Sequence, residues 1–291
     1  MCDEQTIKDW EQYLKNNPVS RRKFNTLTAG AGLSAAFPSI ANAQQLTSEP
    51  VSIQTPDGTA DCFMVHPASG TYPGVILWTD VLSLRPAYEQ MAARLAARGY
   101  AVLVPNPYYR SAPAPVVEAG ASFQDQATRD IVLPMAGQLN PQTHVSDANA
   151  FIEYLDNHSA VDSSRPMGTM GYCMGGPIVM RTAAARPDRI GAVASFHGGG
   201  LATDADNSPH LLIPGTDADF LIAIAENDDA NDPEAKQILR DAFAAAGKNA
   251  EVEVYDGALH GWTVLDSRVY HEEQAERAWN RLVVLFEKAL I

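Results

Sequence analysis

The hexapeptide Gly171-Tyr172-Cys173-Met174-Gly175-Gly176 joins an apolar run, 167–170, to a segment of helical composition, 177–186. G-x-C-x-G between a strand and a helix is typical of a nucleophile elbow, a tight and strained turn that presents a reactive side chain. Flanking glycines avoid clashes there. The turn points the sulfur of Cys173 at the N-terminus of the following helix, whose partial positive charge favours a thiolate. A buried structural cysteine in a Gly-rich loop is the alternative interpretation.

A carboxylate follows a second strand. The apolar run 220–225 predicts a buried parallel strand, and it leads directly into the acidic stretch 226–229. A carboxylate therefore stands at the carboxyl end of this strand. Asp228 is the first choice for an acid that orients a histidine, and Asp229 is the alternative.

A histidine follows a third strand. Residues 251–255 alternate as a strand does, and they lead into a Gly-flanked loop that contains His260. Sites in open parallel sheets lie at the carboxyl ends of the strands, so we expect Cys173, Asp228 and His260 to meet at one edge. Their order along the chain, nucleophile then acid then histidine, is that of α/β-hydrolases.

The remaining histidines show less pattern. Four are expected in solvated or surface positions: His66, His144, His158 and His271. His197 follows a predicted strand and is a candidate for the pocket wall, and His210 is a candidate for a cover over it. No histidine shows metal-ligand spacing with another His, Cys or carboxylate pair, so we predict neither a metal nor a cofactor.

Strands and helices alternate beyond an N-terminal hairpin, which turns at Pro56-Asp57-Gly58. The predicted strands are 51–55, 59–66, 74–79, 100–104, 167–172, 190–196, 219–225 and 250–255, and the predicted helices are 86–98, 144–157, 175–186, 233–246 and 271–289. This alternation predicts a single α/β domain with a mostly parallel sheet and helices on both faces. The Pro-, Ala- and Gln-rich stretch 106–142 is predicted to be a loop over the active-site edge.

These motifs resemble the dienelactone hydrolase family. The resemblance rests on 171–176, on the strand end at Asp228, on His260-Gly261-Trp262 and on the block 98–110. It covers the chain from about Val51 to the C-terminus. It implies a small α/β-hydrolase fold without a large cap, and hydrolysis of an enol lactone bearing a carboxylate through an acyl-cysteine intermediate.

The resemblance also implies roles. Cys173 is similar to the family's nucleophile, Asp228 to its orienting acid and His260 to its base. For the oxyanion of such a reaction we expect two backbone N–H donors, those of Met174 and Val81. A thiolate forms thioesters readily from activated esters and lactones, so an ester or lactone is the predicted small-molecule substrate.

Further positions match the family less closely. Asp80 takes the place of a glutamate that helps to control thiol ionisation, and Arg110 that of an arginine which binds the substrate carboxylate. A local salt bridge is the alternative for Arg110. A second family arginine is absent, because Val264 stands at its position, which puts dienelactone itself in doubt. Tyr109 and Trp262 are candidates for an aromatic pocket wall, with buried packing as the alternative.

Composition fits one catalytic domain. The chain has 291 residues, of which 46% are hydrophobic and 19% charged, enough to bury a large core. A net charge of −14 argues against binding to nucleic acid or to an anionic lipid surface. We also expect no membrane span in the mature protein, because no later segment offers about 18 uninterrupted apolar residues.

The N-terminus carries an export pattern. Ser20-Arg21-Arg22-Lys23-Phe24 matches the twin-arginine signal, and an apolar stretch, 27–37, and Ala41-Asn42-Ala43 follow it. We expect residues 1–43 to be a leader that is cleaved after Ala43, and residues 44–291 to be the mature domain. The twin-arginine export machinery would then be a partner, and the mature protein would be periplasmic. A disordered arm with two adjacent arginines is the alternative.

Two other functional classes stay open. A thiol acyl-transfer or redox protein would use Cys173 without net hydrolysis, although no C-x-x-C accompanies it. A catalytically idle binding protein would keep the fold alone. Cys2 leaves with the leader, and we expect Cys62 and Cys173 to be free thiols, with Cys62 in the core.

Overall fold

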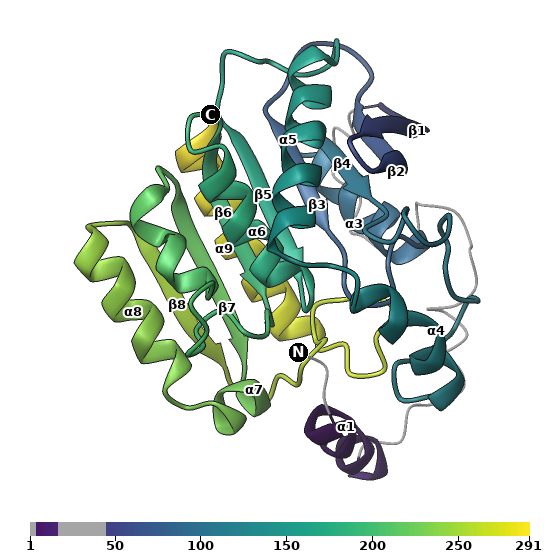
Figure 1. Ribbon diagram of the computed structural model, residues 1–291, viewed down its shortest axis with the longest axis vertical. Helices are drawn as coiled ribbons and strands as arrows, with labels where there is room; N and C mark the ends of the chain where they lie inside the picture. The colour runs from purple at the N-terminus through teal and green to yellow at the C-terminus, as the bar shows by residue number, and fades with distance from the viewer. Residues whose placement is uncertain (1–3, 17–44) are drawn as a thin grey trace.

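A computed structural model describes residues 4–16 and 45–291 of the protein (Figure 1). Within them, one eight-stranded sheet has the order β1-β2-β4-β3-β5-β6-β7-β8. The strands are β1 (Leu46–Thr55), β2 (Gly58–Pro67), β3 (Gly74–Trp78), β4 (Ala101–Pro105), β5 (Met167–Tyr172), β6 (Ile190–Phe196), β7 (Asp219–Ala225) and β8 (Ala250–Tyr255). β1 and β2 form the predicted hairpin, β2 pairs antiparallel with β4, and every pair from β4 to β8 is parallel.

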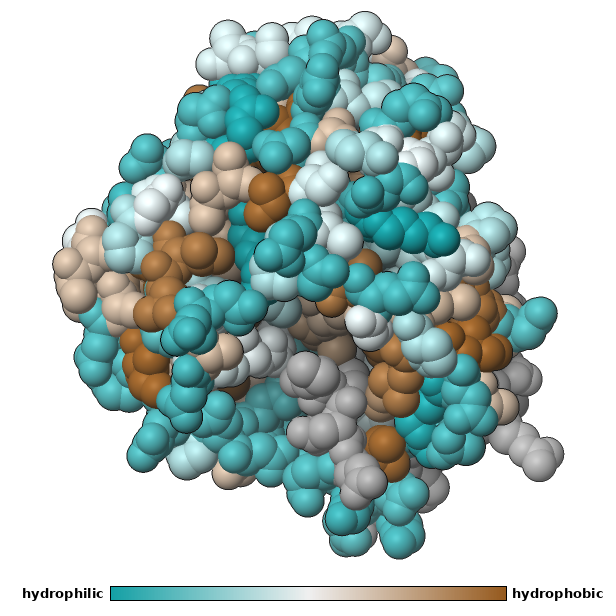
Figure 2. All heavy atoms as spheres, in the orientation of Figure 1, coloured by the Kyte–Doolittle hydropathy of each residue, from teal (hydrophilic) through white to brown (hydrophobic). Residues whose placement is uncertain are grey.

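Helices cover both faces of this sheet (Figure 1). The α-helices are α1 (Glu4–Asn16), α3 (Pro86–Ala96), α4 (Gln126–Ala136), α5 (Pro141–Asn157), α6 (Gly175–Ala185), α7 (Glu226–Asn231), α8 (Ala235–Ala246) and α9 (Glu272–Leu290), and η1 (Pro209–Gly215) is a 3₁₀ helix. Within the described ranges, every helix is too short or too polar to span a lipid bilayer. The face in Figure 2 is mostly hydrophilic, in keeping with the high net charge.

Two apolar clusters form the core, one on each face of the sheet. Alternation along β4 divides its side chains: Val102 and Val104 pack with α3 and α9, whereas Ala101 and Leu103 pack with α5 and α6. The predicted fold, a single α/β-hydrolase domain with a mostly parallel sheet, is confirmed.

A third apolar cluster lies at the carboxyl edge of the parallel strands. We name it the edge cluster, and its buried members are Trp10, Val81, Leu82, Val117, Phe123, Val132 and Val269. These residues come from α1, from the loop after β3, from the segment between β4 and α5, and from the loop before α9. Four segments far apart in sequence therefore close one edge of the sheet.

The prediction of a loop over 106–142 was wrong in part, because this stretch contains α4. On α4 only Thr128 and Val132 are buried, and Pro134 lies inside the helix, so little helical periodicity is visible in the sequence. The helix predicted over 233–246 is preceded by α7, which begins directly after β7 and carries both candidate carboxylates.

The surface position predicted for His144 was also wrong. His144 lies in the first turn of α5 and is 8% exposed. Asp147, Ala148 and Phe151 follow it at three-, four- and seven-residue spacing and are buried too, so His144 belongs to the inward face of the helix.

Candidate active site

Cys173 lies on a sharp turn between β5 and α6. Its φ is +52°, a left-handed conformation that residues other than glycine seldom adopt. Its backbone N–H donates to the carbonyl oxygen of Phe196 at 3.0 Å, which ties the turn to β6. A side chain at Gly171 would place its Cβ 2.5 Å from the carbonyl oxygen of Gly175, so the close turn requires glycine there. The local chain thus forms the predicted strand–turn–helix.

His260 lies on the loop after β8 and faces a carboxylate from α7. Its Nδ1 is 2.8 and 3.0 Å from the two carboxylate oxygens of Asp228. Its backbone N–H donates to Oδ1 of Asn227 at 2.8 Å. Asp229, the alternative acid, instead forms an ion pair with Lys236 at 2.6 Å. Asp228 is therefore the carboxylate that orients the imidazole.

The imidazole of His260 is held in its charged form. It is 1% exposed, and burial alone disfavours the charge. The carboxylate of Asp228 outweighs burial, and the charge and hydrogen bond of Cys173 act in the same direction, so the pKa of His260 is raised to about 10. A buried imidazolium thus contacts the sulfur of Cys173, which favours an ion pair between the two.

His197 is a second buried histidine in the site. It directly follows β6, as Cys173 directly follows β5. The last residues of these two strands, Tyr172 and Phe196, are register partners, so Cys173 and His197 leave the sheet side by side. The φ of His197 is +41°, which is also in the left-handed region. Its ring centroid is 4.9 Å from that of His260, in an edge-to-face arrangement. Burial, together with the charge of His260, lowers the pKa of His197 well below its usual range. A neutral imidazole therefore packs against a charged one.

Val81 and Met174 carry the two backbone N–H groups that are expected to bind an oxyanion, and this role stays a prediction. Among the described residues, neither the N–H of Val81 nor that of Met174 has a protein acceptor. The hydroxyl of Tyr108 lies 3.0 Å from the carbonyl oxygen of Val81 and 3.2 Å from Sδ of Met174. Tyr108 thus connects the two donor segments.

The carboxylate of Asp80 is engaged by an arginine that sequence reasoning missed. Arg85 Nη1 and Nη2 donate to its two oxygens at 2.7 and 2.9 Å, and Arg85 Nε donates to Asp266 at 2.8 Å. No local signal links Arg85 to Asp266, because they lie 181 positions apart. Control of thiol ionisation by Asp80 stays a prediction.

Arg110 and Tyr109 form a network within the protein. Arg110 donates to Asp147 at 2.7 Å and to Asp57 at 2.6 Å. The hydroxyl of Tyr109 donates to the same Asp147 at 2.8 Å. The local salt bridge, the alternative interpretation of Arg110, is thus present. Whether Arg110 or Tyr109 also contacts a substrate stays a prediction.

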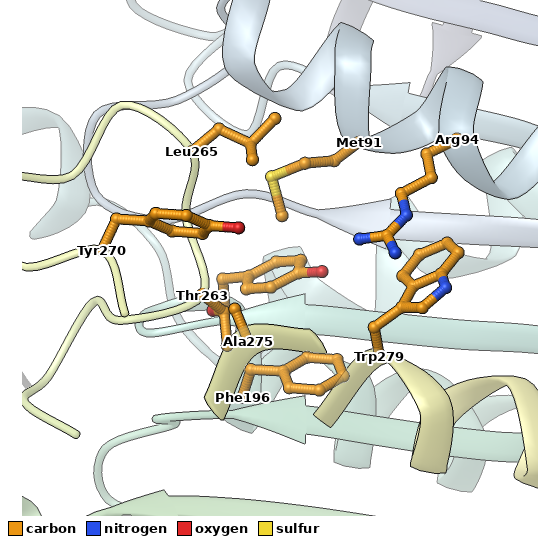
Figure 3. A pocket seen from close by; sticks show the side chains of 9 residues that line it. Met91, Arg94, Phe196, Thr263, Leu265, Tyr270, Ala275 and Trp279 are labelled. Carbon is orange, nitrogen blue, oxygen red and sulfur yellow. The ribbon is translucent and has the colours of Figure 1, made fainter. Parts of the chain in front are cut away.

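Trp262 is fully buried between Tyr255 and His197. Nearby, a cavity of about 30 Å³ lies between α3, α9 and the sheet, with the guanidinium of Arg94 over the ring of Trp279 at its side (Figure 3). This volume holds about one water molecule. The cavity is lined by Met91, Arg94, Tyr172, Phe196, Thr263, Leu265, Tyr270, Ala275 and Trp279. It is too small for an ester substrate.

The sequence and the fold have counterparts among known proteins. Residues 60–290 match the dienelactone hydrolase family. The chain belongs to this family. It is 28% identical over 248 residues to the carboxymethylenebutenolidase of Rhodococcus opacus, which covers 82% of this chain and 92% of that protein. It is 23% identical over 237 residues to the carboxymethylenebutenolidase of Pseudomonas putida, which covers 81% and 94%.

Solved structures of similar proteins share the fold. A dienelactone hydrolase-like promiscuous phosphotriesterase from metagenomic libraries superposes with a TM-score of 0.67 at 20% identity, covering 84% of this chain and 99% of that one. The dienelactone hydrolase of Anabaena variabilis gives a TM-score of 0.60 at 17% identity, covering 85% and 100%. This member of the dienelactone hydrolase family is a hydrolase. Among residues 4–16 and 45–291, no three His, Cys, Asp or Glu side chains are arranged to hold a metal ion.

Proposed function

We propose that this protein hydrolyses a carboxylic ester or lactone through an acyl-cysteine intermediate, with Cys173 as nucleophile, His260 as acid and base, and Asp228 as the orienting carboxylate. One observation carries the proposal: His260 is buried between the Asp228 carboxylate and the Cys173 sulfur, and its pKa is raised to about 10. Groups with strongly shifted pKa values that face one another at a strained turn are typical of catalytic sites.

The reaction divides into two steps. In the first, the thiolate of Cys173 attacks the carbonyl carbon, and the N–H groups of Val81 and Met174 bind the oxyanion. His260 gives its proton to the leaving oxygen as the C–O bond breaks, which leaves a thioester on Cys173. In the second, His260 takes a proton from water, whose oxygen attacks the thioester, and the thiolate is released with the acid. Losing one oxyanion donor typically costs about 3 kcal/mol of transition-state stabilisation.

The substrate class follows from leaving-group chemistry and from the relatives. Enolate and aryloxide oxygens leave a tetrahedral intermediate more easily than an amine does, so an ester or lactone suits a thiolate better than an amide. The names of the relatives add an enol lactone of the dienelactone type as a candidate. Val264 is buried in the core where the family has its second arginine, so we propose an ester or lactone with fewer anionic contacts than dienelactone.

The location is a separate proposal that rests on sequence alone. The twin-arginine motif at 20–24 and the cleavage motif at 41–43 lie outside the described residues. We propose export by the twin-arginine route, cleavage after Ala43 and a periplasmic mature domain. Cell fractionation of a tagged full chain, beside the Arg21→Lys, Arg22→Lys double variant, tests it. Loss of the periplasmic product in the variant supports export, and an unchanged distribution contradicts it.

The test of the activity uses the chain from Gln44 onward, which retains all eight strands. Hydrolysis of short p-nitrophenyl esters and of a dienelactone is measured beside Cys173→Ala. Turnover by the parent that the substitution abolishes supports a cysteine hydrolase, and the ratio between the substrates shows how far the missing arginine shifts specificity. Equal turnover by both forms contradicts the proposed nucleophile. A folded parent without turnover on any ester would favour an idle binding scaffold.

A further inference from the structure

Helix α1 lies against the catalytic loop, beside α7 (Figure 1). Trp10, in the middle of α1, is only 8% exposed, and its indole N–H donates to the backbone carbonyl oxygen of His260 at 2.8 Å. A Cβ added to Gly261 would come 3.4 Å from the indole ring. The indole therefore packs directly against the residue whose imidazole faces Cys173.

A second contact holds α1 to the same loop. The carboxylate of Asp9 accepts a hydrogen bond from Nδ2 of Asn227 at 3.0 Å, while Oδ1 of Asn227 accepts the backbone N–H of His260 at 2.8 Å. Asn227 also directly precedes Asp228 on α7, so α1 is joined both to the helix that carries the acid and to the loop that carries the base. The side chains of α1 that point away are polar and exposed: Gln5, Lys8, Glu11, Gln12 and Lys15.

The indole lies in the edge cluster, which is otherwise lined by apolar side chains. Val81, the proposed oxyanion donor, belongs to this cluster together with Phe123 and Val269. These three are 7%, 3% and 2% exposed in the presence of α1. Without Trp10 they would line an apolar recess next to the reacting carbonyl. Apolar surface of this kind favours an apolar occupant.

We propose that the place of the Trp10 indole is the apolar subsite of the active site, which takes a flat aromatic ring of the ester substrate, and that α1 competes with substrate for it. The proposal rests on the proposed function and deepens it. A carbonyl oxygen at the Val81 N–H would direct the adjoining substituent into the edge cluster. The structure therefore describes the closed form, in which Cys173 and His260 are 3% and 1% exposed.

Loss of residues 1–43 would remove the competing indole and leave the subsite open. The chain would then be closed as a precursor and open once the N-terminal segment is gone. The ring that enters must be planar and apolar, and a hydrogen-bond donor on its rim would find the carbonyl oxygen of His260, as the indole N–H does. Aryl esters fit this description better than short alkyl esters.

The test compares full-length forms in a reaction that needs no ester turnover. The unchanged chain, Trp10→Ala and Gln12→Ala are treated with iodoacetamide, and alkylation of Cys173 and Cys62 is followed separately by mass spectrometry. Gln12 is exposed on the same helix and is the matched control. We expect Cys173 of Trp10→Ala to react at least about tenfold faster, since a buried tryptophan usually dominates such a contact. Cys62 should stay slow in all three, which shows that the fold is intact.

Indole then serves as the probe of the subsite. Added to Trp10→Ala, it should slow alkylation of Cys173 back towards the rate of the unchanged chain, whereas acetamide, a small polar control, should have no effect. Equal Cys173 rates in the three forms, or indole without effect, would overturn the proposal. Because alkylation reports access to the thiol, both results are independent of whether any ester is cleaved. A chain that alkylates as expected but hydrolyses nothing would count against the proposed function alone.

Discussion

Two regions of this molecule each bury a cysteine and a histidine, but the charges near the two histidines shift their pKa values in opposite directions. At the active-site edge, Cys173 and His260 are 3% and 1% exposed. On the flank formed by β2 and α5, Cys62 and His144 are 3% and 8% exposed. Burial together with the charge of Asp61 raises the pKa of Cys62 far above its usual range. Burial together with nearby arginines lowers the pKa of His144 to about 3.

The difference lies in the facing charge and not in burial. His260 faces a carboxylate and a thiol, and its pKa is raised to about 10. His144 faces arginines, and both of its ring nitrogens lack a hydrogen-bond partner among the described residues. A buried histidine is thus charged at one place and neutral at the other. A buried ionisable group indicates a catalytic site only when its partner stabilises the reactive form.

The largest expected contrast is between the two thiols. Cys173→Ala should lower kcat for ester hydrolysis by about 10⁴-fold or more, because the group that forms the covalent intermediate is removed. Cys62→Ala should leave kcat within about threefold, because this thiol is neutral core packing. Steady-state kinetics on p-nitrophenyl acetate measures both. A comparable loss in the two variants would remove the distinction between the regions.

The two neighbouring carboxylates of α7 offer the next contrast. Asp228→Asn should lower kcat by about 10³–10⁴-fold, because the amide no longer orients or charges His260. Asp229→Asn, which loses only its ion pair with Lys236, should stay within about threefold. Kinetics of the two variants at pH 7 measures this. Similar losses in both would show that the geometry assigns the wrong acid.

The pH profile sharpens the same contrast. With a pKa of about 10, His260 stays protonated through neutral pH and loses its proton as the pH rises through 10. We therefore expect kcat/KM to fall above about pH 10, where no proton is left for the leaving oxygen. In Asp228→Asn this fall should move to lower pH, because the charge that raised the pKa is gone. An unmoved profile would contradict the pairing.

On the flank, Arg110→Met tests whether the arginine serves the fold or the substrate. The Asp147 side chain is 3% exposed, so loss of its guanidinium partner should lower the free energy of unfolding by about 3–5 kcal/mol. Arg186→Met breaks an exposed pair with Asp188 and is the control, with a loss of about 1 kcal/mol or less. Urea unfolding measures both. A KM that rises for anionic but not for neutral esters would instead favour carboxylate binding.

The smallest expected effect is the acid sensitivity due to His144. Its folded pKa of about 3 lies below the unfolded value of 6.5, so the unfolded chain takes up a proton that the folded chain refuses. His144 therefore does not change the free energy of unfolding above pH 6.5. As the pH falls below this value, His144 lowers the free energy of unfolding progressively, by about 2 kcal/mol at pH 5. His144→Leu should lose less stability than the parent between pH 7 and pH 5. Equal losses in urea unfolding would contradict the neutral state.

Much of the fold was readable from local chemistry. The period-2 and apolar runs predicted all eight strands to within a few residues at most ends, and Gly58 closed the predicted hairpin opposite Thr55. The turn at Cys173 needed only its flanking glycines. The helix at 126–136 was not predicted, because its two buried side chains give too little helical periodicity. The position of His144 was wrong because α5 begins earlier than its apolar pattern suggests.

The sequence by itself determined the alternation of strands and helices, the elbow at Cys173, and the order in which cysteine, acid and histidine reach one edge of the sheet. These depend on periodicity and on backbone chemistry within a few residues. Only the tertiary structure decided that Asp228 and not Asp229 contacts His260, and that Trp10 packs beneath a residue 250 positions away. Such contacts depend on how separate elements pack together, and no local pattern records that packing.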